Sequence, residues 1–392
     1  MRFATRFLLL GAILLPLMPA AEASAAVQIT TSMPQPVSGT VTITATVTGV
    51  PRLGQIVIGV DAAQAFVCAK SPCAFPWNTT GVADGAHTIQ ARALSTAGKV
   101  KGSSSLSVTV SNQTSGGGGP TIAGCSVFPS DNAWNTDIST WPVHPNSANF
   151  LASIGSANLH PDWGDIYGIP YTTVPGDETR YPMTFHYADQ SDPGPYPIPP
   201  DAPIEPGSDR HILALDRDNC VLYEVYDAHW TGSGWSAGSG AVWDFKIDAT
   251  RPAGWTSADA AGLPILPGLV RYDEVVQKGV MDHAVRFTVS QTQHGYIAPA
   301  SHFASDSTNP NLPPMGLRLR LKSGFNISGF HPQIQVILRA LKTYGMIVAD
   351  NGSSWYVTGE LNPLWDNTIL DQLKTVSSSN FDVVYTGEVV TQ

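Results

Sequence analysis

Residues 263–303 gather ionisable side chains within a segment that otherwise has the composition of buried strands. The chain as a whole is poor in charge, with 13% Asp, Glu, Lys and Arg, so this local concentration marks a candidate functional site. Carboxylates, histidines and arginines perform general acid–base chemistry and neutralise anionic intermediates. The ionisable residues considered in this segment are Arg271, Asp273, Glu274, Asp282, His283, Arg286, His294 and His302.

Hydrolysis of a glycosidic bond is one chemistry that these residue types support, because it uses two separated carboxyl groups. Glu224, together with Asp273 or Glu274, would supply the acid and the base. If residues 223–230 form a strand, Glu224, Tyr226 and Trp230 point the same way. A carboxylate beside aromatic rings suits a sugar, since rings pack on the apolar faces of pyranoses. Tyr226 and Trp230 are therefore predicted to bind substrate, and the alternative is a solvated sheet face.

β-Elimination is the second chemistry, in which an arginine neutralises a uronate and a histidine or tyrosine takes the α-proton. Arg271 or Arg286 would bind the uronate, and His294, Tyr296 and His302 surround a neighbouring turn. We predict catalytic roles for the two histidines and substrate-binding roles for Arg271 and Tyr296. Hydrolysis is favoured over elimination.

Structural roles compete with these chemical ones. Residues 269–276 are predicted to form a strand, on which Arg271 and Asp273 share a face. His283 falls on the apolar face of the next strand, as a core histidine does. Asp282 and Arg286 would then form ion pairs with Arg271 and Asp273 across the sheet.

Two short motifs are interpreted as turns. Residues 234–238 match GxSxG around Ser236, but Gly/Ser-rich neighbours replace the strand and helix that a nucleophile elbow requires. Residues 216–219 carry the acidic start of a calcium loop without its glycine and distal glutamate. We predict no metal site and no cofactor.

The first 25 residues predict a secretory signal peptide, with Arg2 and Arg6 before an apolar run and a small-residue cleavage site. No later run is long enough to span a membrane as a helix. The net charge of −10 argues against nucleic acid as a partner, because phosphate binding needs clustered Lys and Arg. The sequence therefore predicts a secreted protein.

Residues 27–112 alternate Thr with Val, Ile and Ala in short runs separated by turns, which predicts a β-sandwich. The phrase FPWNTTGVADGAHTIQARALSTAGK resembles the bacterial Ig-like domains. That resemblance implies a spacer or binding module without catalytic residues. Residues 113–120, QTSGGGGP, predict a flexible linker.

Residues 121–392 are predicted to form a larger β-rich domain, sandwich-like or jelly-roll-like, with one or two helices packed on it near its C-terminus. A helix is predicted to begin at Pro332 and to end at Gly345, and short helices are predicted over 146–154 and 366–376. Hairpins are predicted around residues 216–219 and 350–352. Residues 189–209 hold seven prolines and predict an extended surface crossing.

Several phrases of this domain, among them FPSDNAWNTDIS and LPPMGLRLRLKSGF, resemble a family of secreted bacterial proteins that often carry Ig-like or carbohydrate-binding modules. The resemblance implies no activity. Four cysteines in an exported chain predict two disulfides, Cys68–Cys73 and Cys125–Cys220. We expect a carbohydrate-active protein with an extracellular polysaccharide as its partner: a glycoside hydrolase ahead of a polysaccharide lyase. The alternative is a non-catalytic carbohydrate-binding or adhesion protein.

Overall fold

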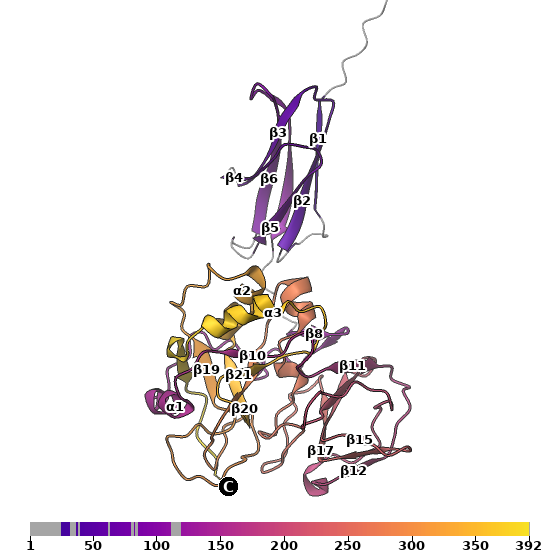
Figure 1. The fold of residues 1–392 in the computed structure, drawn as a ribbon, viewed down its shortest axis with the longest axis vertical. Helices are drawn as coiled ribbons and strands as arrows, with labels where there is room; N and C mark the ends of the chain where they lie inside the picture. Colours follow the sequence, from indigo (N-terminus) through magenta and orange to yellow (C-terminus); the bar gives the residue numbers. More distant parts are fainter. Residues whose placement is uncertain are drawn as a thin grey trace, which may run out of the picture. The chain divides into compact units, whose positions relative to one another are not determined.

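A computed structural model describes residues 25–31, 37, 40–61, 63–79, 82, 85–110 and 119–391 (Figure 1). The chain divides into two compact units, Met1–Asn112 and Gln113–Gln392. Nearly all of the predicted signal peptide and most of the predicted linker lie outside the described residues. Each unit is described separately below.

The first unit consists of two antiparallel sheets that enclose a common apolar core. Side chains of its strands alternate between buried and exposed, as the period-two pattern predicted. The disulfide Cys68–Cys73 is present as predicted. The strands, in sheet order, are β1 (Ala26–Thr31), β2 (Thr40–Thr48) and β5 (Cys73–Asn78), then β4 (Ala63–Cys68), β3 (Leu53–Val60), β6 (Gly85–Ser95) and β7 (Val100–Val110).

The second unit is built mainly from mixed β-sheets, so the predicted mainly-β class is confirmed. Its largest sheet has six strands and contains the parallel pairs β18–β20 and β10–β21. In sheet order these strands are β10 (His160–Asp162), β21 (Tyr356–Thr358), β18 (Val285–Val289), β20 (Met346–Asn351), β19 (Arg318–Leu321) and β22 (Phe381–Val384).

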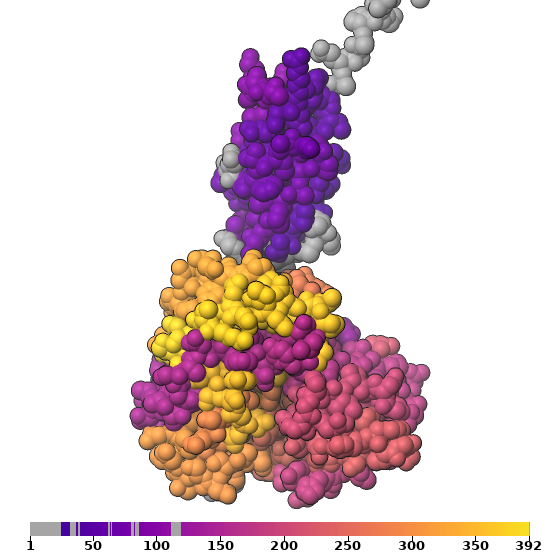
Figure 2. Space-filling model, viewed as in Figure 1, coloured from indigo at the N-terminus to yellow at the C-terminus, as the bar shows by residue number. Residues whose placement is uncertain are grey.

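The remaining sheets of this unit come from the middle of the chain. Figure 2 shows them as a pink region beside the orange-to-yellow region of β18–β22. A four-stranded sheet holds β11 (Tyr171–Val174), β13 (Ile212–Asp216), β14 (Val221–Tyr226) and β17 (Ser239–Asp244). Smaller sheets are formed by β12 (Met183–Phe185), β16 (Trp235–Ala237) and β15 (His229–Trp230), and by β8 (Thr121–Ile122) and β9 (Cys125–Ser126).

The three predicted helices are confirmed. The longest, α2 (Pro332–Thr343), buries its apolar stripe, and the chain leaves it through Gly345 at φ 72°. The others are α1 (Ser147–Ile154) and α3 (Asn367–Leu370), the last continued by the 3-10 turn η5 (Asp371–Thr375). Further 3-10 turns are η2 (Ala188–Gln190), η3 (Leu266–Gly268) and η6 (Ser378–Asn380).

The hairpin β13–β14 is present as predicted, and the side chain of Asp216 organises its turn. The Asp216 carboxylate accepts hydrogen bonds from the backbone N–H groups of Asp218 and Asn219 at 3.1 and 2.9 Å. The disulfide Cys125–Cys220, also predicted, ties this turn to the start of the unit. The carboxylate of Asp218 accepts instead from the backbone N–H of Gly176 at 2.8 Å, so both acidic side chains of the turn have structural partners.

The strand predicted over residues 269–276 is wrong. The chain there forms η4 (Asp273–Lys278), a single π-helical turn that ends at Gly279. Arg271 and Glu274 form an i, i+3 ion pair, a spacing at which side chains meet on a helix and not on a strand. Alternating polar and apolar residues over such a short run fit either backbone.

The hairpin predicted around residues 350–352 is also wrong, because β20 and β21 do not pair with each other. β18 lies between them, parallel to β20 and antiparallel to β21. The backbone N–H of Gly352 donates to the carbonyl of Val289 at 2.8 Å, on the intervening strand. After β20 the chain therefore crosses β18 and returns on its other side as β21. Asp350 lies near the end of β20.

Candidate functional site

The ionisable residues of 271–283 form a closed cluster. Arg271 is fully buried and donates to the carboxylate of Glu274. His283, also fully buried, engages Glu274 Oε2 through Nε2 at 3.0 Å and the Ala284 carbonyl through Nδ1 at 2.7 Å. Asp273 lies 3.5 Å from Arg271 and 2.7 Å from Lys278. Arg271 Nε, Arg271 Nη1 and Asp273 Oδ1 are buried without a hydrogen-bond partner among the described residues, so the cluster is held by charge more than by hydrogen bonds. None of these residues lines the pocket described below.

Glu224 is completely buried in the core beneath β14. Its carboxyl accepts from the backbone N–H groups of Ile265 and Leu266 and from Nε1 of Trp243, at 2.8–3.1 Å. Burial raises the pKa of Glu224, and the hydrogen bonds from Leu266 and Ile265 lower it by less, so that the net pKa is about 7. The side chain fixes the start of η3 and has no access to solvent.

Three other predicted residues, Trp230, His294 and Tyr296, lie outside the pocket described below. Trp230 packs on Trp235, with ring centroids 5.3 Å apart. His294 packs on Phe303, with ring centroids 3.8 Å apart. Tyr296 is buried and bridges to Met315 and Val390 through its backbone. The predicted roles of the three residues stay predictions.

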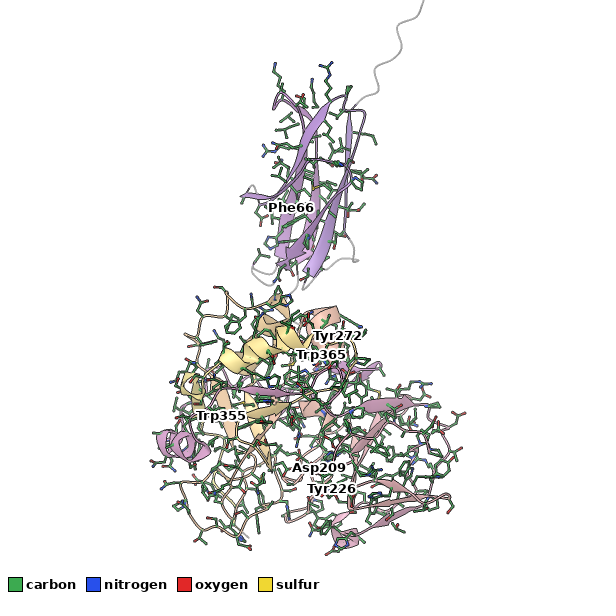
Figure 3. The ribbon with its side chains drawn as sticks, viewed as in Figure 1. Phe66, Asp209, Tyr226, Tyr272, Trp355 and Trp365 are labelled. Carbon is green, nitrogen blue, oxygen red and sulfur yellow. A yellow bond between two sulfur atoms is a disulfide. The ribbon has the colours of Figure 1, made fainter. Side chains whose placement is uncertain are left out.

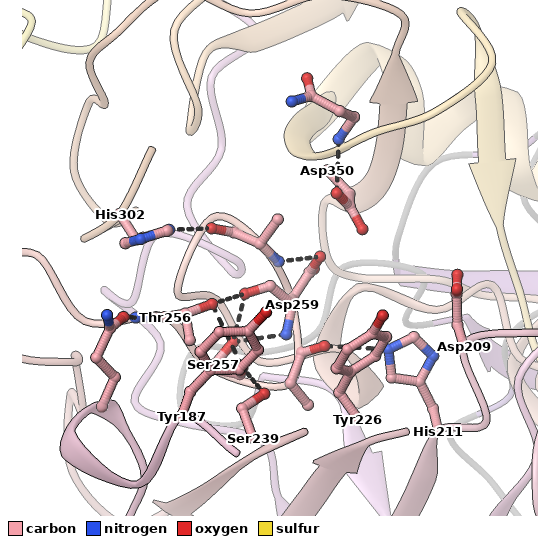
Figure 4. Close-up of a pocket in the computed structure, with 14 residues that line it drawn as sticks. Tyr187, Asp209, His211, Tyr226, Ser239, Thr256, Ser257, Asp259, His302 and Asp350 are labelled. Carbon is pink, nitrogen blue, oxygen red and sulfur yellow. Dashed lines mark hydrogen bonds between the residues drawn. The ribbon is translucent and has the colours of Figure 1, made fainter. Parts of the chain in front are cut away.

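A pocket of about 450 Å³ opens between the four-stranded sheet and the end of β20 (Figure 4). Of the predicted site residues, it includes Tyr226 and His302. Figure 3 shows Asp209 and Tyr226 well apart from Tyr272, the neighbour of Arg271. The lining residues are Tyr187, Gln190, Asp209, His211, Tyr226, Ser239, Thr256, Ser257, Ala258, Asp259, Ala260, His302, Asp350 and Asn351.

Backbone hydrogen bonds bring three segments of the pocket wall together. The N–H of Tyr187 donates to the carbonyl of Gly238, and the N–H of Gly238 donates to the carbonyl of Tyr226. The N–H of Asp227 donates to the carbonyl of Asp209. A Cβ at Gly238 would lie 2.5 Å from the Tyr226 ring, so this close approach requires glycine.

Asp259 lines the pocket, and Arg286 binds its carboxylate from behind. Arg286 on β18 donates to both oxygens of Asp259 at 3.0 and 2.9 Å and to Thr358 Oγ1 at 2.8 Å. Burial lowers the pKa of the Arg286 guanidinium, but the charge and hydrogen bonds of Asp259 outweigh it and raise that pKa above its ordinary value. This bidentate pair joins the pocket to the six-stranded sheet.

His211 contributes its ring to the wall, but both of its nitrogens are engaged. Nδ1 lies 2.5 Å from Glu205 Oε2, and Nε2 lies 3.0 Å from the carbonyl of Ala258. Burial lowers the pKa of His211, and the hydrogen bond and charge of Glu205 raise it by more, to a net value above the ordinary one. His211 is therefore a structural cation and has no nitrogen left for a ligand.

Two carboxyl groups of the pocket have very different surroundings. Asp350 is half-buried and accepts from the N–H of Asn351 at 2.6 Å. Burial, followed by the charge of Asp259, raises the pKa of Asp350 to about 7. Asp209 is exposed. Burial raises the pKa of the Tyr226 phenol, and the charges of both Asp209 and Asp350 add to that shift. Both carboxyl groups thus act on one phenol.

His302 is half-buried at the opposite side of the same pocket in Figure 4. Its Nδ1 donates to the carbonyl of Ala260 at 2.8 Å, which fixes the orientation of the ring. With Nδ1 protonated, the neutral ring carries its lone pair on Nε2. His302 was predicted as catalytic, and that role stays a prediction.

Sequence reasoning missed Tyr187, Gln190, Asp209, Asp350 and Asn351. The proline-rich segment 189–209 was interpreted as a surface crossing, yet residues at both of its ends line the pocket. Asp350 was assigned to a turn. An available signal was its place directly after the buried run of β20, because polar residues at the ends of core strands commonly lie in ligand sites.

Comparisons with known proteins say little about this site. No family model and no curated protein matches the chain. Among solved structures it is similar to the fibronectin(III)-like modules of Clostridium thermocellum CbhA, at 20% identity over 22% of this chain and 96% of that chain, with a TM-score of 0.19. Within the described residues, no helix is long and apolar enough to cross a membrane. The two disulfides are compatible with an extracellular protein.

Proposed function

We propose that this chain is a secreted glycoside hydrolase that cleaves an extracellular polysaccharide in the pocket around Asp350. Asp350 acts as the general acid, protonating the oxygen of the leaving sugar. Asp209 acts as the second carboxylate, the base or nucleophile. These two residues replace Glu224, Asp273 and Glu274 in the roles first assigned from the sequence. The first unit serves as a spacer or binding module.

The contrast between Asp350 and Asp209 carries this proposal. A hydrolase needs one carboxyl group that holds its proton near neutral pH and another that is ionised. Burial raises the pKa of Asp350 to about 7, whereas Asp209 is exposed to solvent. Both line one pocket, and both raise the pKa of Tyr226.

The remaining lining groups suit a sugar. Tyr187 is 46% exposed and offers a ring face, as does the half-buried Tyr226. Gln190 and Asn351 carry amide groups that donate to and accept from hydroxyls. Aromatic faces with a few polar groups are typical of pockets that bind small molecules and sugars.

Hydrolysis is favoured over elimination by the placement of the arginines. Elimination on a uronate needs a cation facing the substrate, and the described residues that line the pocket include no Lys or Arg. Arg271 and Arg286, the two candidates, are buried in ion pairs with Glu274 and Asp259. The carboxyl groups of the pocket would repel a uronate.

A reducing-end assay on a panel of polysaccharides tests the proposal. We expect new reducing ends without the ultraviolet absorbance of an unsaturated uronate. Asp350→Asn should lower kcat at least about 100-fold, the contribution expected of a general acid. Activity should fall as the pH rises through about 7, because the acid then loses its proton.

Asp306→Asn is the matched control, since this carboxylate is fully exposed and lies outside the pocket. It should retain wild-type activity. Absence of product from every glycan, or an Asp350→Asn variant as active as the wild type, would overturn the hydrolase proposal.

A non-catalytic carbohydrate-binding protein is the second candidate. It is favoured by the number of lining groups already used internally: Ser239 Oγ donates to the Ser257 carbonyl, Ser257 Oγ donates to the Leu263 carbonyl, and Asp259 is bound by Arg286. In that case Asp350→Asn and Asp209→Asn would change affinity alone, and no glycan would be cleaved.

A further inference from the structure

The cations behind the pocket walls are each neutralised by a carboxylate of their own. Each of the three is at most 7% exposed. Their partners lie within hydrogen-bonding distance, and the pairs are Arg286–Asp259, His211–Glu205 and Arg251–Asp192. Arg251 also donates to the carbonyls of Gln190 and Thr256 at 2.7 and 3.0 Å. These groups have no charge left over for a ligand.

Asp209 and Asp350 are the carboxyl groups that this pairing leaves out. Within the described chain, neither carboxylate lies within 4.0 Å of a side-chain nitrogen of Lys, Arg or His. The Asp350 carboxylate receives a backbone N–H from Asn351 instead. Because Asp350 holds its proton as the general acid, the negative charge of the wall comes from Asp209, which accepts a hydrogen bond from Ser208 Oγ at 3.1 Å but has no paired cation among the described residues. The electrostatic potential of this carboxylate favours a cation.

The ring faces of the pocket point to the same kind of ligand. Tyr187 and Tyr226 both line it, and an ammonium group over a tyrosine face is attracted by the negative charge of that face. A hydrogen bond from an ammonium to a carboxylate is roughly twice as strong as one between neutral groups. A neutral sugar forgoes both interactions.

Resting on the hydrolase proposal above, we propose that the substrate is a glycan with free amino groups, built from deacetylated hexosamine units. Asp209, the second carboxylate of the hydrolase, also binds the ammonium group of the bound sugar, and the ring of Tyr187 or Tyr226 covers that group. Asp350 is left to protonate the glycosidic oxygen. Specificity thus arises from charge that the protein itself leaves unpaired.

Calorimetric titration of the full chain tests this inference. The Asp350→Asn variant is titrated with glucosamine, N-acetylglucosamine and galacturonate oligomers of equal length, at a mildly acidic pH where the amino groups are protonated. We expect the glucosamine oligomer to bind at least about tenfold more tightly than the acetylated one at low salt. That preference should shrink as salt rises from about 50 to about 500 mM, because ions screen exposed charges.

Asp209→Asn, made in the same background, should reduce the preference to about twofold or less, whereas Asp306→Asn should leave it unchanged. Equal affinities for the two hexosamine oligomers, a preference that survives Asp209→Asn, or binding of oligolysine but of no glycan would overturn the inference. Cleavage of neutral glycans without an ammonium preference would overturn the inference about the substrate, while the proposal that the protein is a hydrolase would stand. An ammonium preference without cleavage of any glycan by the wild type would overturn the hydrolase proposal, while the selectivity for amino sugars would stand.

Discussion

The cluster around Arg271 and the pocket around Asp350 contain the same kinds of side chain, yet they differ in how charge is satisfied. In the cluster, Arg271 and His283 share the carboxylate of Glu274, and all three are buried. In the pocket, Asp350 and Asp209 face an open space without a paired cation. A dense run of charges in a sequence therefore predicts mutual neutralisation as readily as chemistry.

Removing Glu274 should have the largest effect on stability. Glu274→Ala leaves Arg271 and His283 buried without their shared partner, and breaking a buried ion pair costs about 3–5 kcal/mol. Urea denaturation measures the loss, with the half-buried Asp273→Asn as the control. A loss below about 1 kcal/mol would mean that the cluster is not held by this carboxylate, and the contrast between the two regions would fail.

Glu224→Gln should have an intermediate effect. The Gln side chain presents an NH₂ group to a site where three N–H donors now meet a carboxyl, so one or more donors lose their acceptor. An unsatisfied buried donor costs about 1–3 kcal/mol. The measurement is again urea denaturation, combined with the reducing-end assay. A specific loss of activity in a variant of unchanged stability would return Glu224 to the active site.

Of the three substitutions, Asp350→Asn should have the smallest effect on stability, and it should stabilise the protein where the other two destabilise it. The pKa of Asp350 is raised from its ordinary value of 3.8 to about 7, so the folded chain holds this proton more tightly than the unfolded chain does. The stabilisation from this proton is complete below pH 3.8 and is lost as the pH rises through about 7. Relative to that of the wild type, the free energy of unfolding of the variant should rise by about 1–2 kcal/mol from mildly acid to mildly alkaline pH.

Thermal melts of the two proteins across this pH range measure the gain. If the difference does not change with pH, the Asp350 carboxyl is not buried enough to act as a proton donor. The comparison would then lose the feature that separates the pocket from the closed cluster.

Much of the architecture was predictable because it depends on local pattern. Alternation in residues such as Val41, Ile43 and Ala45 predicts a half-buried strand, and Pro332 and Gly345 mark the ends of a helix. Both disulfides followed from four cysteines in a chain whose sequence predicts export. These features need only neighbouring residues or simple counting.

The pocket was not predictable in the same way, because it joins residues as far apart as Tyr187 and Asp350. Asp350 lies on a strand that pairs with β18 and not with β21, and the hairpin-like sequence at 350–352 conceals this order. The π-helical turn at Asp273 likewise changes which side chains meet. Sheet order and backbone type, both set by tertiary packing, decide this site.

The Cys125–Cys220 disulfide also determines how the second unit would carry mechanical load. Tension that reaches Cys125 from the first unit crosses the sulfur–sulfur bond directly to Cys220, which is 95 positions further along the chain, so the loop between the two cysteines lies outside the force path. Tyr187, Asp209 and His211 belong to that loop. In a chain held at its first unit under flow, segments outside this loop would therefore extend first, and these parts of the pocket would keep their positions. Reduction of the disulfide would remove that protection.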